Sequence, residues 1–575
     1  MGKLVGPQSA GSAGRARIAR RVLALLLAVL CMSVMVACGD DDDDGGGGGG
    51  GGEARQGGSI TISQTSQPDF LDPALSYTVN GIEPLWLVYT PLITYPRTGE
   101  MEKDASLIPG LAEEMPTISK DGKSYELTLR QGLKYSDGSP VKASDFEHTI
   151  KRVLNLESGG SAFYLGITGA QDYVDAGRCN GDISGIETND QSGKITINLD
   201  APDGTFSHVL AMWFAGLVPG DTPCENLTED PPPGVGPYMI TESVPNRQFV
   251  MEKNKNFPDL GADIPPGNVD TITTKIIKNP QRQAQDVISG ELDYMQDPPP
   301  ADLKPEVQAE YSDRYEEVTT ASTYYVFMNH RVPPFDKPEI REAVNWGIDK
   351  PALARLFAGE LAPGCSFLPP GVPGFDEAMD VEECPFGNPN EPPDLEKARQ
   401  MIEDAGEAGT KLTVYGNNDD PTDKVTAAIA DQLTKMGFEA EPKILDGGVY
   451  FQTIGSAEER AQVGFANWFQ DFPHPKNFMF LVDGASIQPT NNQNFGNVDD
   501  PEITKGIAEL NQEPEINDDV TERWRELNVR LVEGAHVVPY GHRKLATFLS
   551  ERMDFENCRR FHPVYFNDYS SWCLR

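Results

Sequence analysis

The stretch around residue 470 contains the side chains best suited to hold a charged ligand. An apolar run, Val463–Ala466, predicts a strand, and Trp468 and Asp471 follow it. In α/β proteins, ligand-binding groups lie at the carboxyl ends of strands. A carboxylate there can hold an ammonium group through a short charge-assisted hydrogen bond, and aromatic rings supply an apolar wall. We therefore predict that Asp471 is a charge anchor flanked by Trp468, Phe469 and His474.

A purely structural interpretation of these residues stays open at this point. Asp471 can cap the turn at Pro473 while Trp468 fills a core. The two interpretations differ in what the loss of the carboxylate does. Loss of a ligand anchor lowers affinity, whereas loss of a cap lowers stability by about 1 kcal/mol and leaves affinity unchanged.

The eight cysteines fall into two groups. Cys31 and Cys38 belong to the N-terminal segment, and the other six follow it without the paired spacing of zinc or redox sites. Behind an export signal, such cysteines indicate structural disulfides rather than a metal site. Six cysteines allow 15 connectivities. Proximity in the sequence favours the pairs Cys365 with Cys384 and Cys558 with Cys573, which leaves Cys179 with Cys224.

Catalytic motifs do not occur in the sequence. There is no HExxH, GxSxG or Walker motif, and the seven histidines are scattered. Abundant acidic residues leave a glycosidase-like carboxylate pair as an alternative. We expect a protein that is not an enzyme and that uses no cofactor or metal.

Length and charge restrict the class of protein further. A chain of 575 residues exceeds what one core usually supports, so more than one lobe is expected. The formal charge of -40 argues against nucleic acid, because phosphate binding needs basic patches. A strong negative field favours solubility and cationic solutes.

Secondary structure is clearest in the stretch from residue 122 to 155. Tyr125, Leu127 and Leu129 alternate with polar residues, the period of a half-buried strand. After a turn, Ser144 and Glu147 fit a capping box at the start of an amphipathic helix. Farther along, "KLTVYG" and "DKVTAAIADQLTKMGFEAE" alternate strand, helix and strand, the rhythm of a parallel sheet.

The string "YELTLRQGLKYSDGSPVKASDFEHTIKRVL" closely resembles the signature of the family 5 extracellular solute-binding proteins. That family comprises the peptide- and nickel-binding receptors of bacterial ABC importers. "GVGPYMITESVPNRQFVMEKNKNF" and the stretch Ser322–Gly364 are similar to further parts of it. The resemblance covers nearly all of residues 57–575, and it implies a two-lobed α/β fold of the periplasmic-binding type (type II, cluster C) with an extra small domain.

The resemblance also implies roles for individual residues. The loop around Trp468 resembles the family pattern W-x-x-D-x-x-D/E-P-x-x-F, whose first aspartate pairs with a peptide's amino terminus. That aspartate is Asp471 here, whereas His474 replaces the second acid, which leaves the peptide specificity open. Alignment with the oligopeptide receptors places Tyr77 and Val79 beside the ligand.

The domain organisation follows from the same matches. We predict lobe I at residues 57–105, 218–325 and 540–575, domain II at 106–217, and lobe II at 326–539. Four arginines (Arg15, Arg17, Arg20 and Arg21) precede the apolar run Val22–Ala37, which is typical of a secretory signal peptide over residues 1–37. Ala37-Cys38 resembles a bacterial lipobox, so we expect a lipid on Cys38. The Asp/Gly tract that follows predicts a disordered linker over residues 38–56.

These inferences combine into one expectation. The chain is a monomeric receptor, lipid-anchored at the outer face of the cell membrane. It captures a solute by hinge closure and delivers it to the permease subunits of an ABC transporter. A peptide is the expected solute, with a metal chelate or an oligosaccharide as alternatives. A third class, a surface sensor or scaffold with the same fold, also stays open.

Overall fold

A computed structural model describes residues 55–156, 158–177, 179, 181–419, 421–490, 492–513 and 516–575. These residues belong to one unit, Gly52–Arg575. The predictions for the signal peptide, for Cys38 and for most of the linker concern residues outside the described part. Within the described ranges, no helix combines the length and the apolar character that crossing a membrane requires.

A sheet of twelve strands is the central element, with β18 in its middle. The order is β16-β15-β17-β13-β18-β11-β1-β10-β9-β8, and β12 and β14 also pair with β18. The bounds are β1 (Ser59–Gln64), β8 (Tyr238–Val244), β9 (Gln248–Lys253), β10 (Thr271–Ile276), β11 (Tyr294–Met295), β12 (Tyr315–Thr319), β13 (Ser322–Met328), β14 (Leu361–Ala362), β15 (Lys411–Asn417), β16 (Glu439–Leu445), β17 (Val463–Phe469) and β18 (Val537–Leu549).

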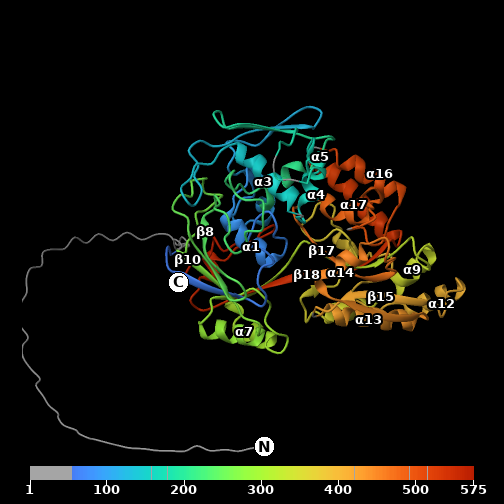
Figure 1. Cartoon of the computed structure of the whole chain (residues 1–575). Helices are drawn as coiled ribbons and strands as arrows, with labels where there is room; N and C mark the ends of the chain where they lie inside the picture. The colour runs from blue at the N-terminus through green and yellow to red at the C-terminus, as the bar shows by residue number, and fades with distance from the viewer. Residues whose placement is uncertain are drawn as a thin grey trace, which may run out of the picture. The chain divides into compact units, whose positions relative to one another are not determined.

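Three clusters of buried apolar residues lie in the described part of the chain. The first contains residues between 60 and 294 and between 549 and 572 together with Phe472, the second contains residues between 324 and 540, and a small third one contains residues between 284 and 307 and Phe548. The part around the first cluster comprises the predicted lobe I and domain II, and the part around the second is lobe II. The long strand β18 runs from one to the other (Figure 1), and all seven residues of its neighbour β13 are buried. β13 is therefore covered on both faces, and its residues from Tyr324 to Met328 form a continuous apolar run, as is typical of such strands.

Helices cover both lobes. Their bounds are α1 (Val79–Val88), α2 (Met101–Asp104), α3 (Ser144–Asn155), α4 (Ser161–Tyr164), α5 (Ala170–Asp175), α6 (Phe206–Val209), α7 (Pro280–Ser289), α8 (Lys304–Glu310), α9 (Pro338–Gly347), α10 (Lys350–Arg355), α11 (Glu377–Val381), α12 (Leu395–Asp404), α13 (Thr422–Met436), α14 (Gly447–Ile454), α15 (Lys476–Met479), α16 (Pro501–Leu510), α17 (Asp518–Glu533) and α18 (Phe555–Cys558). β15 and β16 pair in parallel around α13, as the alternation of strand and helix in the sequence predicts.

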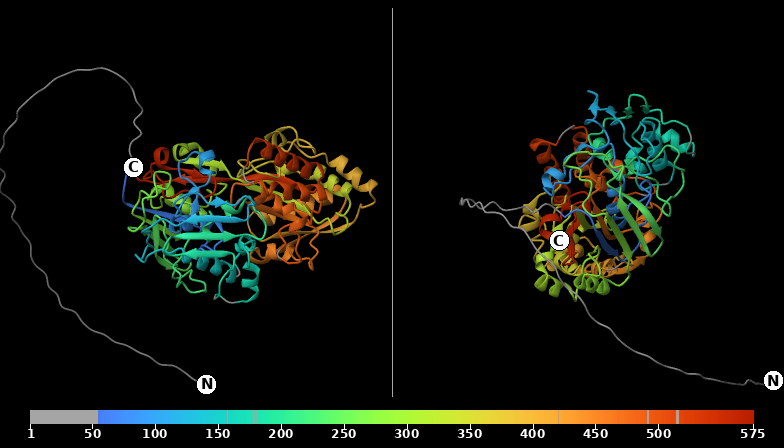
Figure 2. Two further views of the ribbon diagram at one scale, coloured as in Figure 1. Left: turned by 90° about the horizontal axis from the view of Figure 1, so that it is seen from above. Right: turned by 90° about the vertical axis from the view of Figure 1, so that its left-hand side faces the viewer.

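A separate sheet of four strands holds the stretch in which the secondary structure was clearest. Its order is β4 (Thr117–Ile118), β5 (Ser124–Thr128), β7 (Lys194–Asn198) and β6 (Ile186–Asn189), shown in cyan in Figure 2. Two short pairs, β2 (Ile93–Thr94) with β3 (Ile108–Pro109) and β19 (Phe561–His562) with β20 (Phe566–Asn567), complete the described strands. Tyr125 and Leu127 of β5 are buried, as the alternation predicts.

The predicted capping box at the start of α3 is wrong. The Ser144 backbone N–H and hydroxyl donate to the Asp190 carboxylate instead, at 2.9 and 3.1 Å. The Glu147 carboxylate accepts from Ile183 N and pairs with Lys151, so it does not reach back to the helix start. Both partners, Asp190 and Ile183, come from the chain around β6, about 40 residues later, and a local pattern does not contain them.

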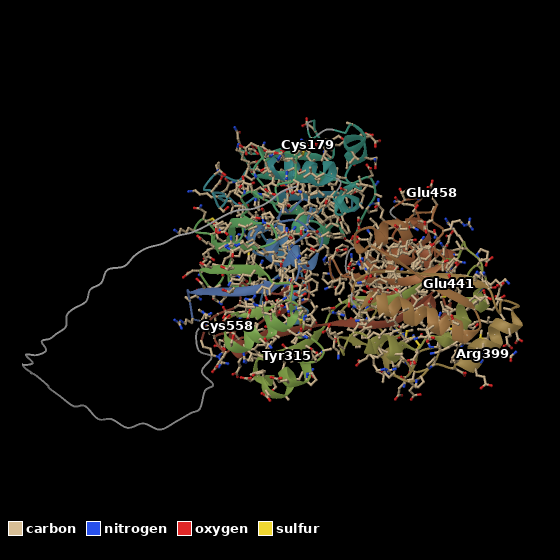
Figure 3. The ribbon with its side chains drawn as sticks, turned by 60° about the horizontal axis from the view of Figure 1, so that its bottom comes forward. Cys179, Tyr315, Arg399, Glu441, Glu458 and Cys558 are labelled. Atoms are coloured by element: carbon tan, nitrogen blue, oxygen red, sulfur yellow. A yellow bond between two sulfur atoms is a disulfide. The ribbon has the colours of Figure 1, made fainter. Side chains whose placement is uncertain are left out.

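The three predicted disulfides are confirmed as pairs. Their Cα atoms lie 6.1 Å apart in Cys179–Cys224, 5.9 Å in Cys365–Cys384 and 5.6 Å in Cys558–Cys573. Cys179 and Cys558 lie far apart, both on the side of lobe I, whereas Arg399, Glu441 and Glu458 mark lobe II (Figure 3).

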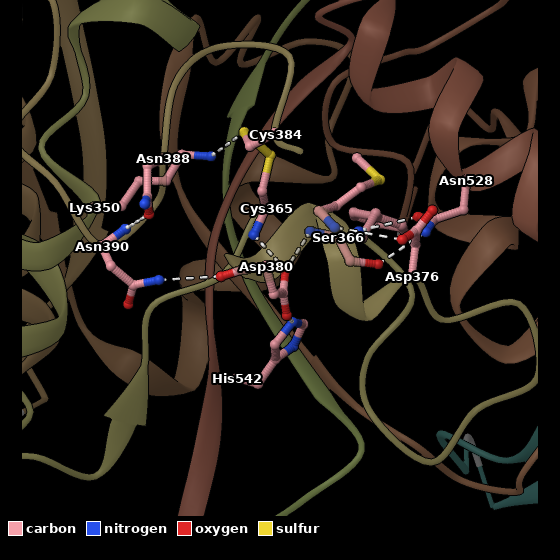
Figure 4. Close-up of a disulfide and its surroundings, with 12 residues drawn as sticks. Lys350, Cys365, Ser366, Asp376, Asp380, Cys384, Asn388, Asn390, Asn528 and His542 are labelled. Carbon is pink, nitrogen blue, oxygen red and sulfur yellow. Dashed lines mark hydrogen bonds and ion pairs between the residues drawn. A yellow bond between two sulfur atoms is a disulfide. The ribbon is translucent and has the colours of Figure 1, made fainter. Parts of the chain in front are cut away.

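The Cys365–Cys384 bridge fixes a loop of lobe II against the crossing strand (Figure 4). Asp380 lies inside the closed loop, and its carboxylate accepts from the backbone of Cys365 and Ser366 at 2.6 and 2.8 Å. His542 of β18 lies 3.0 Å from the same carboxylate. The bridge therefore helps to hold the loop on β18.

Replacing Cys365 and Cys384 together with Ser should lower the free energy of unfolding by about 3 kcal/mol, because the bridge closes a loop with a separation of 19 residues. Urea unfolding monitored by tryptophan fluorescence measures this loss. Wild-type protein under reducing conditions is the control and should lose at least as much. Equal stability of the double variant and the oxidised wild type would contradict a stabilising bridge.

Candidate functional site

Asp471 lies just beyond the end of β17, in lobe II. It is 7% exposed, and its carboxylate accepts a hydrogen bond from Asn477 Nδ2 at 2.8 Å. The Asn477 side-chain oxygen accepts from Asp471 N at 2.8 Å and from Trp468 Nε1 at 3.4 Å. Asn477 thus fixes both the backbone and the carboxylate of Asp471. Sequence reasoning missed this residue, because one polar residue in a short helix gives no periodic signal.

The Tyr77 hydroxyl of lobe I lies close enough to the Asp471 carboxylate of lobe II for the two groups to affect each other's protonation. Burial raises the pKa of Asp471 from 3.8 to about 6, and the neighbouring Asn477 and Tyr77 side chains oppose that shift. Burial and the nearby carboxylate raise the pKa of Tyr77, so the hydroxyl stays protonated. The structure therefore brings two of the predicted site residues together from opposite lobes.

A carboxylate-centred loop holds Tyr77 in place. Asp69 accepts from the backbone of Tyr77 at 2.6 Å and of Thr78 at 3.1 Å. It also accepts from the hydroxyls of Ser76 and Thr78. Hydrogen bonds to one carboxylate, rather than apolar packing, therefore order the loop before α1. This arrangement also puts Val79 at the first position of α1, half-buried, with no hydrogen bond or ion pair to Asp471 among the described residues.

The aromatic side chains predicted near Asp471 pack against other aromatic rings. The Tyr77 ring lies 5.9 Å from Trp213 and 5.6 Å from Phe214, measured between centroids. Trp468 packs edge-on against Phe480, at 5.2 Å. Phe469 is half-buried, and its ring meets Tyr324 of β13 and Phe566 of β20. All these rings are positioned by lobe cores, which gives the site rigid apolar surroundings.

His474 belongs to a second contact beside this site. It is 4% exposed, and its ring lies 6.0 Å from His208 and 5.9 Å from Trp524. Burial, with the neighbouring His208 and Lys476, lowers the pKa of His474 to about 3, so the imidazole is neutral at pH 7. Within the described part of the chain, no hydrogen bond or ion pair joins His474 to Asp471.

Gln470 adds an acceptor next to Asp471. Its side chain is 6% exposed, and its amide group donates to the Pro563 carbonyl of lobe I. Its Oε1 has no hydrogen-bond partner among the described residues. Gln470 is a residue that sequence reasoning did not single out.

Surface hollows lie elsewhere. One of about 440 Å³ is lined by residues of the 67–71 and 226–230 segments, and another of about 510 Å³ lies beside Arg247 and Lys278. Neither of these two hollows is lined by Asp471 or Trp468. Asp471 is itself buried, so a solute can reach its carboxylate only if the surrounding side chains move apart.

A grouping of possible metal ligands occurs at Asp554, Cys558 and Cys573, whose donor atoms lie within 4.8 Å of one another. The two cysteines are joined in a disulfide. A disulfide sulfur is not the thiolate that binds metals. These three residues therefore fit a structural role.

Comparison with known proteins gives consistent matches. The model of the bacterial extracellular solute-binding proteins, family 5 Middle, matches residues 106–489. The chain is 26% identical to the oligopeptide-binding protein OppA of Bacillus subtilis (strain 168) over 392 residues, which cover 65% of this chain and 69% of that protein. It is also 26% identical to the dipeptide-binding protein DppE of the same organism over 351 residues, or 60% and 61% of the two chains.

Solved structures share the fold over most of the chain. The clavulanic acid biosynthesis oligopeptide binding protein 2 matches with a TM-score of 0.81 at 25% identity, over 90% of this chain and 96% of that one. The binding protein DppA of Helicobacter pylori in complex with the peptide STSA matches with a TM-score of 0.71 at 19% identity, over 90% and 98%. The two-lobed α/β fold predicted from the sequence is confirmed.

The raised pKa of Asp471 predicts a pH dependence of stability. Its folded-state pKa, about 6, is above the ordinary 3.8, so the folded protein holds this proton more tightly than the unfolded chain. The resulting stabilisation is present below pH 4 and is lost as the pH rises through 6, by on the order of 3 kcal/mol.

Urea unfolding of wild type and Asp471→Asn at pH 4, 5, 6 and 7 tests this. The variant cannot titrate at this position, so its stability should fall less between pH 4 and 7 than that of the wild type. Asp431→Asn, a change at an exposed position in α13, is the control and should follow the wild type. Parallel profiles for all three proteins would contradict the raised pKa.

Proposed function

Because this chain belongs to the bacterial extracellular solute-binding proteins of family 5, we propose that it captures a peptide outside the cell and delivers it to an ABC transporter permease. The observation that carries the proposal is the Asp471 carboxylate, buried at the end of β17 and met by Tyr77 of the opposite lobe. A peptide's ammonium group offers three donors, and Asp471 and Gln470 offer acceptors.

Relatives support a peptide as the solute. The curated proteins that match are named for oligopeptides, dipeptides, glutathione and D,D-dipeptides. These names describe binding rather than catalysis, which favours a receptor over an enzyme. The replacement of a second acid by the neutral His474 concerns a residue beside the anchor and does not remove the anchor itself.

Binding by hinge closure follows from where the site residues lie. Tyr77 and Asp471 belong to different lobes, so a solute held by both favours the closed form and shifts the population toward it. We propose the hinge where β13 and β18 pass between the lobes. The proposed boundaries are 57–105, 218–325 and 540–575 for lobe I, 106–217 for domain II and 326–539 for lobe II.

The N-terminal sequence supports a membrane tether. We propose that Cys38 carries a lipid, that residues 39–56 are a linker, and that the receptor works as a monomer at the outer face of the membrane. A single folded unit after a lipid-bearing cysteine stays near the permease and raises its local concentration there.

Replacing Cys38 with Ala should release the protein from the membrane fraction or leave it unprocessed, because the thiol that accepts the lipid is lost. Fractionation of cells with immunoblotting measures its location, and mass spectrometry of the N-terminus measures processing. Cys31→Ala, a change of the other N-terminal cysteine, is the matched control and should behave as wild type. Unchanged retention and processing of the Cys38 variant would contradict the anchor.

Asp471→Asn should weaken trialanine binding by roughly 10²- to 10³-fold, the effect of leaving one partner of a buried ion pair alone. Isothermal calorimetry with trialanine and with N-acetyl-trialanine measures it. The wild type should bind only the free-amino form strongly, and Asp431→Asn should bind as wild type.

Mass spectrometry of small molecules released from the purified wild-type protein identifies the natural solute. Peptides with free amino ends are expected. Release of a metal chelate or an oligosaccharide, or wild-type trialanine affinity in Asp471→Asn, would contradict the proposed anchor and solute.

A further inference from the structure

A second contact joins the two halves of the protein, between the predicted domain II and lobe II. Lys476 Nζ lies 2.9 Å from the Asp203 carboxylate and 3.3 Å from the Thr205 hydroxyl. The two residues are 273 positions apart, and each side chain is 28% exposed. Dissolved salt screens a partly buried ion pair less than it screens a fully exposed one.

The Asp203 side of this contact is held rigidly. Its carboxylate accepts from the backbone and hydroxyl of Thr205 at 2.9 and 2.7 Å, and its carbonyl accepts from the Tyr125 hydroxyl at 2.9 Å. Tyr125 belongs to β5, so the turn is fixed to the small sheet. Burial alone would raise the pKa of Asp203, but Lys476 and the Thr205 hydrogen bonds hold it below the ordinary value.

A backbone hydrogen bond at Gly204 belongs to the same contact. Gly204 N donates to the Asn511 carbonyl at 3.0 Å, which lies just beyond α16 in lobe II. A Cβ added at Gly204 would lie 2.5 Å from the Glu513 carbonyl oxygen and 3.1 Å from that of Asn511. Such a distance to backbone is too short, so the approach of lobe II to this turn requires a glycine.

An apolar side chain completes the contact. Phe472 follows Asp471 in the lobe II loop, yet it is 3% exposed and belongs to the first hydrophobic core. Its ring stacks on His208 at 5.7 Å and meets Phe163 edge-on at 6.2 Å. Phe163 and His208 lie within domain II, so the loop that carries the ligand anchor is inserted into it.

The contact is linked directly to the ligand anchor. Lys476 opens α15, and the next residue, Asn477, holds the backbone and carboxylate of Asp471. A change in the contact between the 203–208 turn and Lys476 is therefore transmitted to Asn477, the residue that positions Asp471. Opening of the lobes must break the ion pair, the Gly204 hydrogen bond and the Phe472 insertion together.

We propose that domain II acts as a latch: its 203–208 turn contacts Lys476 and Phe472 of lobe II and thereby stabilises the closed form around Asp471. The expected effect on solute binding rests on the proposed function. The contacts between domain II and lobe II do not depend on which solute is bound. It gives the small domain a role, which is to set how long the closed form persists. In this account Lys476 is a positioning residue, since it acts through Asn477 and Asp471.

Charge reversal tests the latch in the full chain. Lys476→Asp places two acids face to face and should shift the population toward open forms, seen as a larger radius of gyration in small-angle X-ray scattering. Combining it with Asp203→Lys restores an ion pair and should return the radius toward that of the wild type. Lys435→Asp is the matched control, because its partner Asp431 lies on the same helix at 2.6 Å and the pair does not cross the lobes.

Trialanine dissociation, measured by stopped flow, gives the second readout. Lys476→Met should raise the dissociation rate about two- to fivefold, the effect of losing one partly exposed ion pair. Lys476→Arg keeps the charge and should stay close to wild type. A structural role alone would lower the melting temperature without this rescue pattern.

The two readouts separate the two proposals. If trialanine does not bind the wild type, the peptide proposal fails while scattering still decides the latch. A radius unchanged in Lys476→Asp, or a double variant that is no closer to wild type than the single one, overturns the latch whatever trialanine does. An equal change in Lys435→Asp also overturns it, because net charge alone would then explain the effect.

Discussion

The buried ion pair between Asp72 and Arg152 is the interaction on which the binding side of lobe I depends. Two guanidinium nitrogens of Arg152 donate to the two Asp72 oxygens at 3.0 and 2.7 Å, and the side chains are 1% and 0% exposed. A buried pair is stable only if its remaining groups are satisfied. Here Arg152 also donates to the carbonyls of Pro223 and Glu225, and Asp72 accepts from Leu227 N. Loss of either partner leaves a buried charge uncompensated, which typically costs 3–5 kcal/mol.

That ion pair limits where the loop that carries Tyr77 can lie. Arg152 lies on α3, Asp72 lies in the turn before Tyr77, and Cys224 is joined by its disulfide to Cys179 near the end of α5. The pair therefore joins three segments that are distant in sequence, and the Asp69 carboxylate then orders the few residues up to Thr78. Because rigid elements hold these loops, Tyr77 can meet Asp471 without a search through many conformations, and less ordering entropy is lost on binding.

The sequence predicted what local patterns encode, and it missed what distant residues decide. The alternation of apolar and polar residues predicted β5. The order strand, helix, strand predicted the parallel pair β15 and β16 around α13. Proximity sufficed for the disulfides because each closes a loop of at most 45 residues in separation. The capping box failed because Asp190, 46 residues away from Ser144, offers a charged acceptor. The roles of Asn477 and Gln470 could not be predicted, because each depends on partners that only the packed lobes bring within reach.

The burial of Asp471 explains why a cation rather than a neutral group should be held there. A pKa raised to about 6 means that ionising this carboxylate in its buried site is unfavourable by on the order of 3 kcal/mol relative to water. Asn477 donates a neutral hydrogen bond to the carboxylate, and Tyr77 lies nearby, but these neutral groups offset only part of this cost. An ammonium group would supply both donors and opposite charge in the same low-dielectric place, where their attraction is strongest. A neutral solute of the same shape would gain the hydrogen bond and leave the charge uncompensated. In the proposed function, the site would discriminate between solutes through the desolvation that burial already imposes on Asp471.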